Sequence, residues 1–276
     1  MEAPRTIKDL VESFAESTGE AGRLYATYRV IKRMLNDPDC YKFLSFTEYL
    51  VMDPTALRAI VYYIEKGGAD AIMTTAQAVE IEVARAFGSK ELATLSNRQG
   101  VIRLLGEALK DLETGAKLGP STLLERIGSV LAEKGQTGFL AAAYRKHVPV
   151  FAPDLANGVL AYCLIEGARE GLIPHVAIDI LEDEVKLANI VFEHKKLGAV
   201  FLAGGLAKHH VQWWSSFRGG LDYAVQIVTV REYDGSLTGA RLEESITWHQ
   251  LKPEGDKVSV VGDPALLFPL LAYSLL

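Results

Sequence analysis

Short runs of apolar residues alternate with helical patterns along most of this sequence, and this alternation constrains the fold more than any other feature. Most runs are apolar throughout, which is typical of strands that helices cover on both faces of a parallel sheet. We therefore predict an α/β fold with a mainly parallel sheet and helices on both faces. The predicted strands are residues 41–46, 69–73, 148–151, 175–181, 198–203, 224–230 and 257–261.

Helical periodicity marks several segments between and before these strands. Thr6 can cap a first short helix, and Leu24, Tyr28, Ile31 and Leu35 share one face of a second. We expect this helical segment, residues 1–38, to pack on a single domain that spans residues 1–276. Further helices are predicted at 55–66, 99–113 and 122–133, the last starting with a Thr-x-x-Glu capping box at residues 122–125; residues 115–121 are predicted to be a surface loop.

Composition excludes several classes of function. The formal net charge is −6, so there is no basic surplus and we expect no nucleic-acid partner. No apolar run reaches the roughly 18 residues that span a bilayer, and the first ten residues resemble no targeting signal, so we expect no membrane association. Cys40 and Cys163 stand alone without paired spacing, which favours a cytoplasmic location.

Small and polar residues follow most of the predicted strands. Ligands of open parallel sheets bind beyond the carboxyl ends of the strands, so we expect a site at that edge. The alternative is that these residues only form turns, which require Gly, Asp and Ser in any protein. The segments concerned are residues 74–76, 152–154, 182–183, 204–205, 231–236 and 262–263.

The segment 201–210 (FLAGGLAKHH) joins a predicted strand to a helix through Gly204 and Gly205. Glycines at this point let a phosphate approach the backbone at a helix N-terminus. Lys208, His209 and His210 either donate to a substrate or are exposed residues of a first helical turn. No metal site is expected, because adjacent histidines on a helix point about 100° apart and no third ligand is suitably spaced.

A long polar segment, residues 232–250, follows the next strand and contains Trp248. Carboxylates beside an aromatic face suit an organic cation. Composition alone favours the alternative, a solvated loop whose tryptophan fills the core. Trp213 and Trp214 are interpreted as packing or interface residues, and Glu80 lies one helical turn after the hydroxyls of Thr74 and Thr75.

Together these segments resemble the deoxyhypusine synthase family. The resemblance is strongest in residues 148–158, 177–189, 201–210, 222–241, 243–248 and 262–271. It implies a Rossmann-like NAD-binding domain, NAD as cofactor, and a homotetramer with active sites at subunit interfaces. The family dehydrogenates spermidine with NAD and moves the aminobutyl group, through an imine on an enzyme lysine, to a lysine of a translation factor.

Carried over residue by residue, the resemblance is incomplete. The residues expected to bind NAD are Thr75, Ala76, Gly204, Thr229 and Asp263, with Asn157 where the family has an aspartate. The residues expected to bind the amine are Glu80, His209, Gly235, Ser236, Glu244 and Trp248. Several positions depart from the family: Glu48 and Tyr49 replace a Ser-Asn pair, Gln77 replaces a glycine, and Ile81, Tyr162 and Leu237 replace acidic residues.

The largest departure is Gln250, which stands where the family has its imine-forming lysine. An amide nitrogen cannot form a Schiff base. Lys252 lies two residues further on, and a surface role is the better interpretation of it. No catalytic residue is therefore assigned with certainty, and Glu80 and His209 remain candidates.

Three functions stay open. In the first, the chain is an NAD-dependent amine-oxidising aminoalkyl transferase that acts on a smaller amine without a covalent lysine intermediate. In the second, it is a non-catalytic subunit that assembles with an active paralogue, or a sensor of a small ligand. The third is ordinary deoxyhypusine synthase activity. We favour altered or lost chemistry, with an amine or polyamine ligand, a homotetrameric or mixed assembly, and a translation factor as candidate acceptor.

Overall fold

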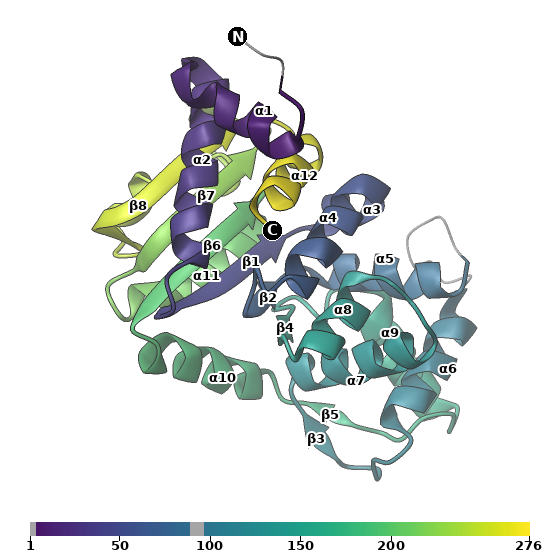
Figure 1. Cartoon of the computed structure of the whole chain (residues 1–276). Coiled ribbons are helices and arrows are strands. Elements are labelled where there is room, and N and C mark those ends of the chain that lie inside the picture. Colours follow the sequence, from purple (N-terminus) through teal and green to yellow (C-terminus); the bar gives the residue numbers. More distant parts are fainter. Residues whose placement is uncertain (1–3, 89–96) are drawn as a thin grey trace.

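The computed structural model describes residues 4–88 and 97–276, and its centre is a six-stranded sheet (Figure 1). Every neighbouring pair of strands is parallel. The order is β4-β2-β1-β6-β7-β8, so the direction of winding reverses between β1 and β6. The predicted α/β fold with a mainly parallel sheet is confirmed. The strands are β1 (Cys40–Phe46), β2 (Ala71–Met73), β4 (Val150–Phe151), β6 (Lys196–Leu202), β7 (Leu221–Val228) and β8 (Leu251–Val261).

Helices cover both faces of this sheet (Figure 1). The helices are α1 (Ile7–Ser13), α2 (Gly19–Leu35), α3 (Glu48–Met52), α4 (Pro54–Glu65), α5 (Ala76–Ala86), α6 (Arg98–Leu109), α7 (Pro120–Glu133), α8 (Phe139–Lys146), α9 (Val159–Arg169), α10 (Ile180–Glu193), α11 (Gly205–Ser216) and α12 (Pro264–Leu275). As predicted, Thr6 caps α1, and its hydroxyl accepts from the amide of Asp9 at 3.0 Å. Helix α2 lies against β7 and β8.

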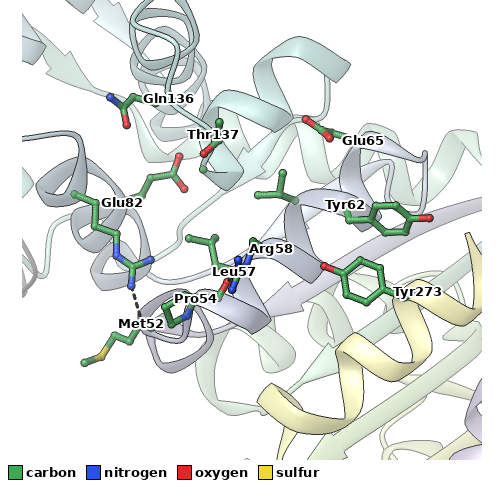
Figure 2. A pocket seen from close by; sticks show the side chains of 13 residues that line it. Met52, Pro54, Leu57, Arg58, Tyr62, Glu65, Glu82, Gln136, Thr137 and Tyr273 are labelled. Atoms are coloured by element: carbon green, nitrogen blue, oxygen red, sulfur yellow. Dashed lines mark hydrogen bonds between the residues drawn. The ribbon is translucent and has the colours of Figure 1, made fainter. Parts of the chain in front are cut away.

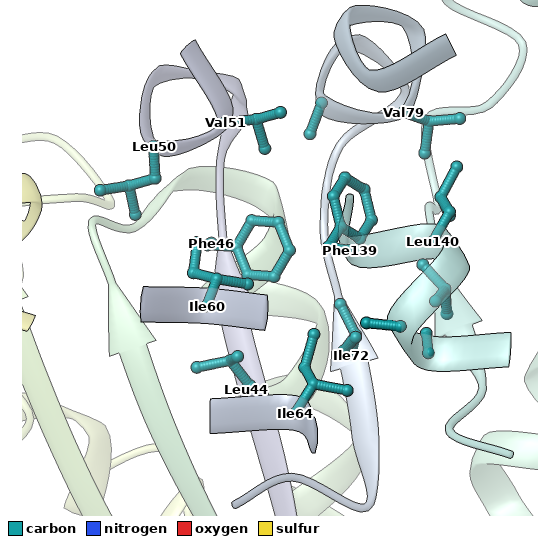
Figure 3. Close-up of a cluster of buried hydrophobic side chains, with 14 of the residues drawn as sticks. Leu44, Phe46, Leu50, Val51, Ile60, Ile64, Ile72, Val79, Phe139 and Leu140 are labelled. Atoms are coloured by element: carbon teal, nitrogen blue, oxygen red, sulfur yellow. The ribbon is translucent and has the colours of Figure 1, made fainter. Parts of the chain in front are cut away.

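Alternate residues of the strands point into two separate hydrophobic clusters, one on each face. On β6, Val200 belongs to the larger cluster, while Phe201 belongs to the smaller cluster beneath α10 and α11. In the larger cluster Phe46 of β1 meets Phe139 of α8 edge-on at 5.1 Å between ring centroids (Figure 3). Burial on both faces explains why the strands are apolar throughout.

The prediction of a strand at residues 175–181 is wrong. Only Ala177–Ile178 (β5) is extended, and it pairs with Lys117–Leu118 (β3) in a separate two-stranded sheet. Helix α10 already starts at Ile180, so residues 182–183 do not lie at the carboxyl edge of the main sheet. Residues 115–121, predicted to be a loop, contain β3.

The predicted capping box at residues 122–125 is also wrong, because α7 starts at Pro120. Its N-terminus is capped by α10: Glu182 accepts from the amide of Gly119 at 2.7 Å, and Asp183 accepts from the amide of Ser121 at 2.9 Å. The Thr122 hydroxyl donates to Glu182 at 2.8 Å. The acidic pair in the segment 177–189 therefore holds α7 to α10.

Candidate functional site

A pocket of about 380 Å³ lies where β1, β2 and β4 end at the carboxyl edge of the sheet. Each strand contributes a polar residue directly after its last residues, because parallel strands all end at the same edge. Its lining residues are Glu48, Thr75, Gln77, Glu80, Asp154, Asn157, Gly158 and Val159. The pocket thus brings together three predicted site residues, Thr75, Glu80 and Asn157, with Glu48 and Asp154. We call it the carboxylate pocket.

Hydrogen bonds fix the side chains at the start of α5. The Thr75 hydroxyl donates to Glu48 Oε2 at 3.0 Å and accepts from the Ala78 amide at 3.2 Å. Asp154 Oδ1 accepts from the Ala76 amide at 2.8 Å. The N-terminus of α5, a position that favours an anion, is therefore occupied by side chains of the protein itself.

Glu80 caps the N-terminus of α9 in the same way. Its side chain is buried, with 5% of the residue exposed, and Oε1 accepts from the Leu160 amide in the first turn of α9 at 2.8 Å. A Cβ atom on Gly158 would lie 2.1 Å from Oε1, so any larger residue there would displace the Glu80 carboxylate. Burial raises the pKa of the Glu80 carboxyl, and the nearby charge of Asp154 raises it further.

The charge of the pocket favours a cation. Glu48, Glu80 and Asp154 all line it, and none of its lining residues is a lysine or arginine. A bound ammonium group would offset three carboxylates that now repel one another. A diphosphate would add further negative charge where two helix N-termini are already capped.

The residues of this pocket therefore do not fit NAD. Ala76, expected on the cofactor side, gives its amide to Asp154. Asp263, also expected there, accepts from the Tyr49 hydroxyl at 2.5 Å and caps α12 through the Ala265 amide. That hydrogen bond raises the pKa of Tyr49 to about 12. Thr229 is exposed after the end of β7, outside the pocket.

Of the two adjacent glycines, Gly204 is closely packed. A Cβ atom on Gly204 would lie 2.6 Å from Thr238 Cα, so the loop after β7 rests against this residue. Lys208 is not the exposed residue that one interpretation offered. It is buried and donates to the carbonyl oxygens of Leu237 and Ala240 at 3.2 and 2.6 Å. Burial lowers its pKa to about 8.

The residues expected to bind the amine, apart from Glu80, lie outside the carboxylate pocket. His209 is on α11, and Gly235, Ser236, Glu244 and Trp248 are exposed along the loop that follows β7. Trp248 is 71% exposed, so the interpretation that it fills the core is wrong. The Ser245 hydroxyl accepts from Gln212 Nε2 at 2.8 Å, which places this loop along α11.

Gln250 lies at the opposite edge of the sheet from the pocket. Its carbonyl oxygen accepts from the amide of Leu221, the first residue of β7, at 3.1 Å. Seven residue steps of strand, about 23 Å, separate that point from the carboxyl end of β7. Lys252, the alternative nucleophile, forms an ion pair with Asp222 at 2.6 Å at the same end. Within one chain neither residue reaches the pocket.

Large apolar side chains remain exposed on α10, α11 and the adjoining loop. The two helices are held together by Glu184, which accepts from Trp214 Nε1 at 2.6 Å. Trp213 packs edge-on against Phe217 at 5.4 Å, and both are half exposed. We call this surface the α10–α11 face; it comprises Ile180, Leu181, Val185, Phe192, Leu206, Trp213, Phe217 and Trp248.

Asp154 is a carboxylate of the pocket that sequence reasoning did not assign to the site. Its position in the segment 152–154, directly after a predicted strand, is the sequence feature that could have identified it as a site residue. Within residues 4–88 and 97–276, no cluster of three or more His, Cys, Asp or Glu is placed to hold a metal ion. Over the same residues, no helix is long and apolar enough to cross a membrane.

The comparisons with known proteins agree with the fold. Residues 9–103 and 98–275 match the family model for deoxyhypusine synthase. Similar curated proteins named "Probable deoxyhypusine synthase" include that of Ignicoccus hospitalis, 32% identical over 96% of this chain and 90% of the relative. Another is that of Thermoplasma acidophilum, 31% identical over 98% of this chain and 93% of the relative.

Two solved structures share the fold at low sequence identity. One, described as "a putative deoxyhypusine synthase from Entamoeba histolytica", has a TM-score of 0.73 at 18% identity and covers 98% of this chain and 92% of that chain. A cyanobacterial arginine dihydrolase has a TM-score of 0.57 at 12% identity, with 99% of this chain matching 33% of that one. The family match spans nearly the whole sequence, and this chain therefore belongs to the deoxyhypusine synthase family.

Proposed function

We propose that this protein binds a short aliphatic amine in the carboxylate pocket and does not perform the lysine-imine transfer of its family. One observation carries the proposal: Glu48, Glu80 and Asp154 converge on a pocket that contains no basic side chain. Polyamines are the substrates of the family, so an organic cation is the ligand class that both family and pocket favour. The pocket volume of about 380 Å³ accommodates a whole diamine or a smaller amine.

Each carboxylate has a distinct part in binding. Glu48, held by Thr75, and Asp154, held by the Ala76 amide, present oriented oxygens for an ammonium group. Glu80 is the most buried of the three, and burial raises the pKa of its carboxyl. A bound ammonium group would lower that pKa again, so that binding at a pH within this titration releases a proton. No step is assigned to NAD, because the pocket does not fit it.

Loss of the imine chemistry follows from Gln250. An amide cannot form a Schiff base, and Lys252 is engaged with Asp222. A role as partner of an active paralogue is the second candidate. The α10–α11 face supports it, because an apolar surface of this kind marks a contact between subunits. The same face would serve a homotetramer.

Calorimetric titration with spermidine, putrescine, agmatine and shorter monoamines tests the ligand. We expect one of these amines to bind, and Glu80→Gln and Asp154→Asn each to weaken binding about tenfold or more. Glu107→Gln is the matched control, since Glu107 is an exposed carboxylate paired with Lys134. Binding that is equal in Glu80→Gln and in the unaltered protein would exclude the carboxylate pocket.

Two further measurements test the chemistry. With NAD and each amine, we expect no rise of NADH absorbance, and with borohydride, NAD and spermidine we expect no covalent adduct. An adduct on the chain, or NADH formed at an ordinary enzyme rate, would overturn the loss of imine chemistry. Addition of an active family member separates the second candidate, because a regulatory subunit would change that enzyme's rate.

A further inference from the structure

A groove of about 960 Å³ lies between α4 and the residues that precede α8, away from the carboxylate pocket (Figure 2). Tyr62 and Tyr273 stand at one end and Glu82 at the other, with Leu57 and Arg58 between them. No residue of this groove lines the carboxylate pocket. A cavity of this size accommodates a ligand as large as a nucleotide.

Two arginines of the groove are anchored close together. Arg85 Nη2 donates to the Met52 carbonyl oxygen at 2.7 Å, and Arg58 Nε donates to the Pro54 carbonyl oxygen at 3.1 Å. These carbonyls are two residues apart, which is at most about 7 Å of chain. Arg58 of α4 and Arg85 of α5 are therefore both anchored at the link between α3 and α4.

Among the residues that the structure describes, neither Arg58 nor Arg85 forms an ion pair, although the charge of Arg85 acts on the Glu82 carboxyl and lowers its pKa against the larger effect of burial. Across residues 4–88 and 97–276, no carboxylate lies within the 4.0 Å of an ion pair from Arg58 or Arg85. The acidic residues of the groove are engaged elsewhere: Glu65 pairs with Arg145 at 3.0 Å, and Glu82 accepts from the amides of Phe139 and Leu140 at 2.6 and 2.8 Å. The groove therefore offers two positive charges to a ligand.

The other end of the groove offers aromatic surface. The rings of Tyr62 and Tyr273 are 4.9 Å apart and tilted, and Tyr273 is 38% exposed. Arg58 lies one helical turn before Tyr62 on α4, so charge and ring occupy one face of the same helix. Guanidinium groups bind phosphate through paired hydrogen bonds, and tyrosine rings stack on a planar base.

We propose that this groove is a binding site for a nucleotide, with the phosphate held between Arg58 and Arg85 and the base against Tyr62 and Tyr273. The site is separate from the amine pocket and does not depend on it. Helix α3 begins at Glu48 in the carboxylate pocket and ends at Met52 in the groove. A bound nucleotide would thus contact the helix that positions Glu48.

Calorimetric titration of the full chain with AMP tests the proposal, with adenosine and inorganic phosphate as the two parts of that ligand. We expect AMP to bind more tightly than either part, and Arg58→Gln and Arg85→Gln each to weaken AMP binding about tenfold. Tyr273→Leu should weaken AMP binding without changing the weaker binding of phosphate. Arg58 is exposed, so Arg58→Gln is expected to leave the fold intact even if Arg85→Gln does not.

Arg103→Gln is the matched control, because Arg103 Nε also donates to the carbonyl of the residue four positions earlier, at 3.3 Å, but lies outside the groove. It should bind AMP as the unaltered protein does. Glu80→Gln should also retain AMP binding, which separates this site from the amine proposal. Absence of AMP binding, or equal binding in Arg58→Gln and Arg103→Gln, would overturn the proposal.

Discussion

Glu80 and Glu82 lie two residues apart on α5, and each accepts amide hydrogen bonds from the first turn of a different helix. Glu80 binds the Leu160 amide of α9, and Glu82 binds the amides of Phe139 and Leu140 of α8. Residues two apart on a helix point to nearly opposite sides, so α5 joins two helices through buried carboxylates. Glu80 also lines the carboxylate pocket, whereas Glu82 lines the groove.

The space beside Glu80 yields a first prediction. Gly158→Ala would place a Cβ atom 2.1 Å from Glu80 Oε1. The φ of Gly158 is 178°, which any residue can adopt, so the effect is one of crowding. We expect destabilisation by about 1–3 kcal/mol, with weaker amine binding, in thermal unfolding and calorimetry. Gly106→Ala in α6 is the control and should stabilise by about 1 kcal/mol or less, since its Cβ would lie 3.7 Å from its neighbours.

Glu82 predicts a pH dependence of stability. Burial raises its pKa from 4.5 to about 7, so the folded chain holds this proton more tightly than the unfolded chain. The stabilisation is complete below pH 4.5 and is lost as pH rises through 7, by about 3 kcal/mol. The thermal midpoint of Glu82→Gln should therefore fall less between pH 5 and 8 than that of the unaltered protein. Parallel curves for the two proteins would contradict this assignment.

Proton release accompanies amine binding if Glu80 is the group that contacts the ammonium. Its pKa is raised by burial, and a bound cation lowers it again, so affinity should increase with pH through that titration. Calorimetry in two buffers of different ionisation enthalpy measures the protons released. Glu80→Gln should abolish the release, while Glu107→Gln should retain it. Equal release from both variants would assign the proton to another group.

The sequence predicts the sheet well because a strand that is buried on both faces is apolar throughout, and this pattern is local in the sequence. All six strands of the main sheet were expected at their places, although β8 begins at Leu251, six residues before its predicted start. The strand predicted at residues 175–181 is wrong because its apolar residues are exposed and not buried. Ile180 and Leu181 are apolar but 63% and 65% exposed, on the α10–α11 face. An apolar pattern does not distinguish a buried strand from an exposed apolar surface.

The site was predicted less completely, because its contacts join distant parts of the chain. Thr75 and Glu80 share one local pattern. Asp154 approaches Ala76 across 78 positions of sequence, and only the order of β2 and β4 brings them together. The capping of α7 was predicted wrongly for the same reason, since Glu182 and the Gly119 amide that it caps are 63 positions apart. The sequence shows which residues after each strand are polar, but the order of the strands in the sheet determines which of these residues come into contact.

The hydrogen bonds of Lys208 lead to the prediction that this residue keeps the loop after β7 well ordered. Its ammonium donates to the carbonyls of Leu237 and Ala240, and a methionine would leave both oxygens without this donor. We expect Lys208→Met to increase hydrogen exchange at residues 237–240 about tenfold. Lys257→Met is the control, since Lys257 also donates to two carbonyls, those of Pro253 and Gly255. Unchanged exchange at 237–240 would show that Lys208 does not hold this loop.

The α10–α11 face predicts a contact with a second subunit. Phe192 is 62% exposed on α10, and burying it against another subunit would remove apolar surface from water. Phe192→Glu would place a charge in that contact, so we expect the mass in solution, measured by light scattering, to fall to that of a smaller assembly. Leu266→Glu is the matched control, because Leu266 is 64% exposed on α12, outside this face. A monomeric unaltered protein, or equal effects of the two variants, would contradict a contact through α10.

If the assembly does dissociate, amine binding shows whether the carboxylate pocket needs the partner. Retained affinity in Phe192→Glu would mean that Glu48, Glu80 and Asp154 are sufficient, and lost affinity that residues of a second subunit complete the site.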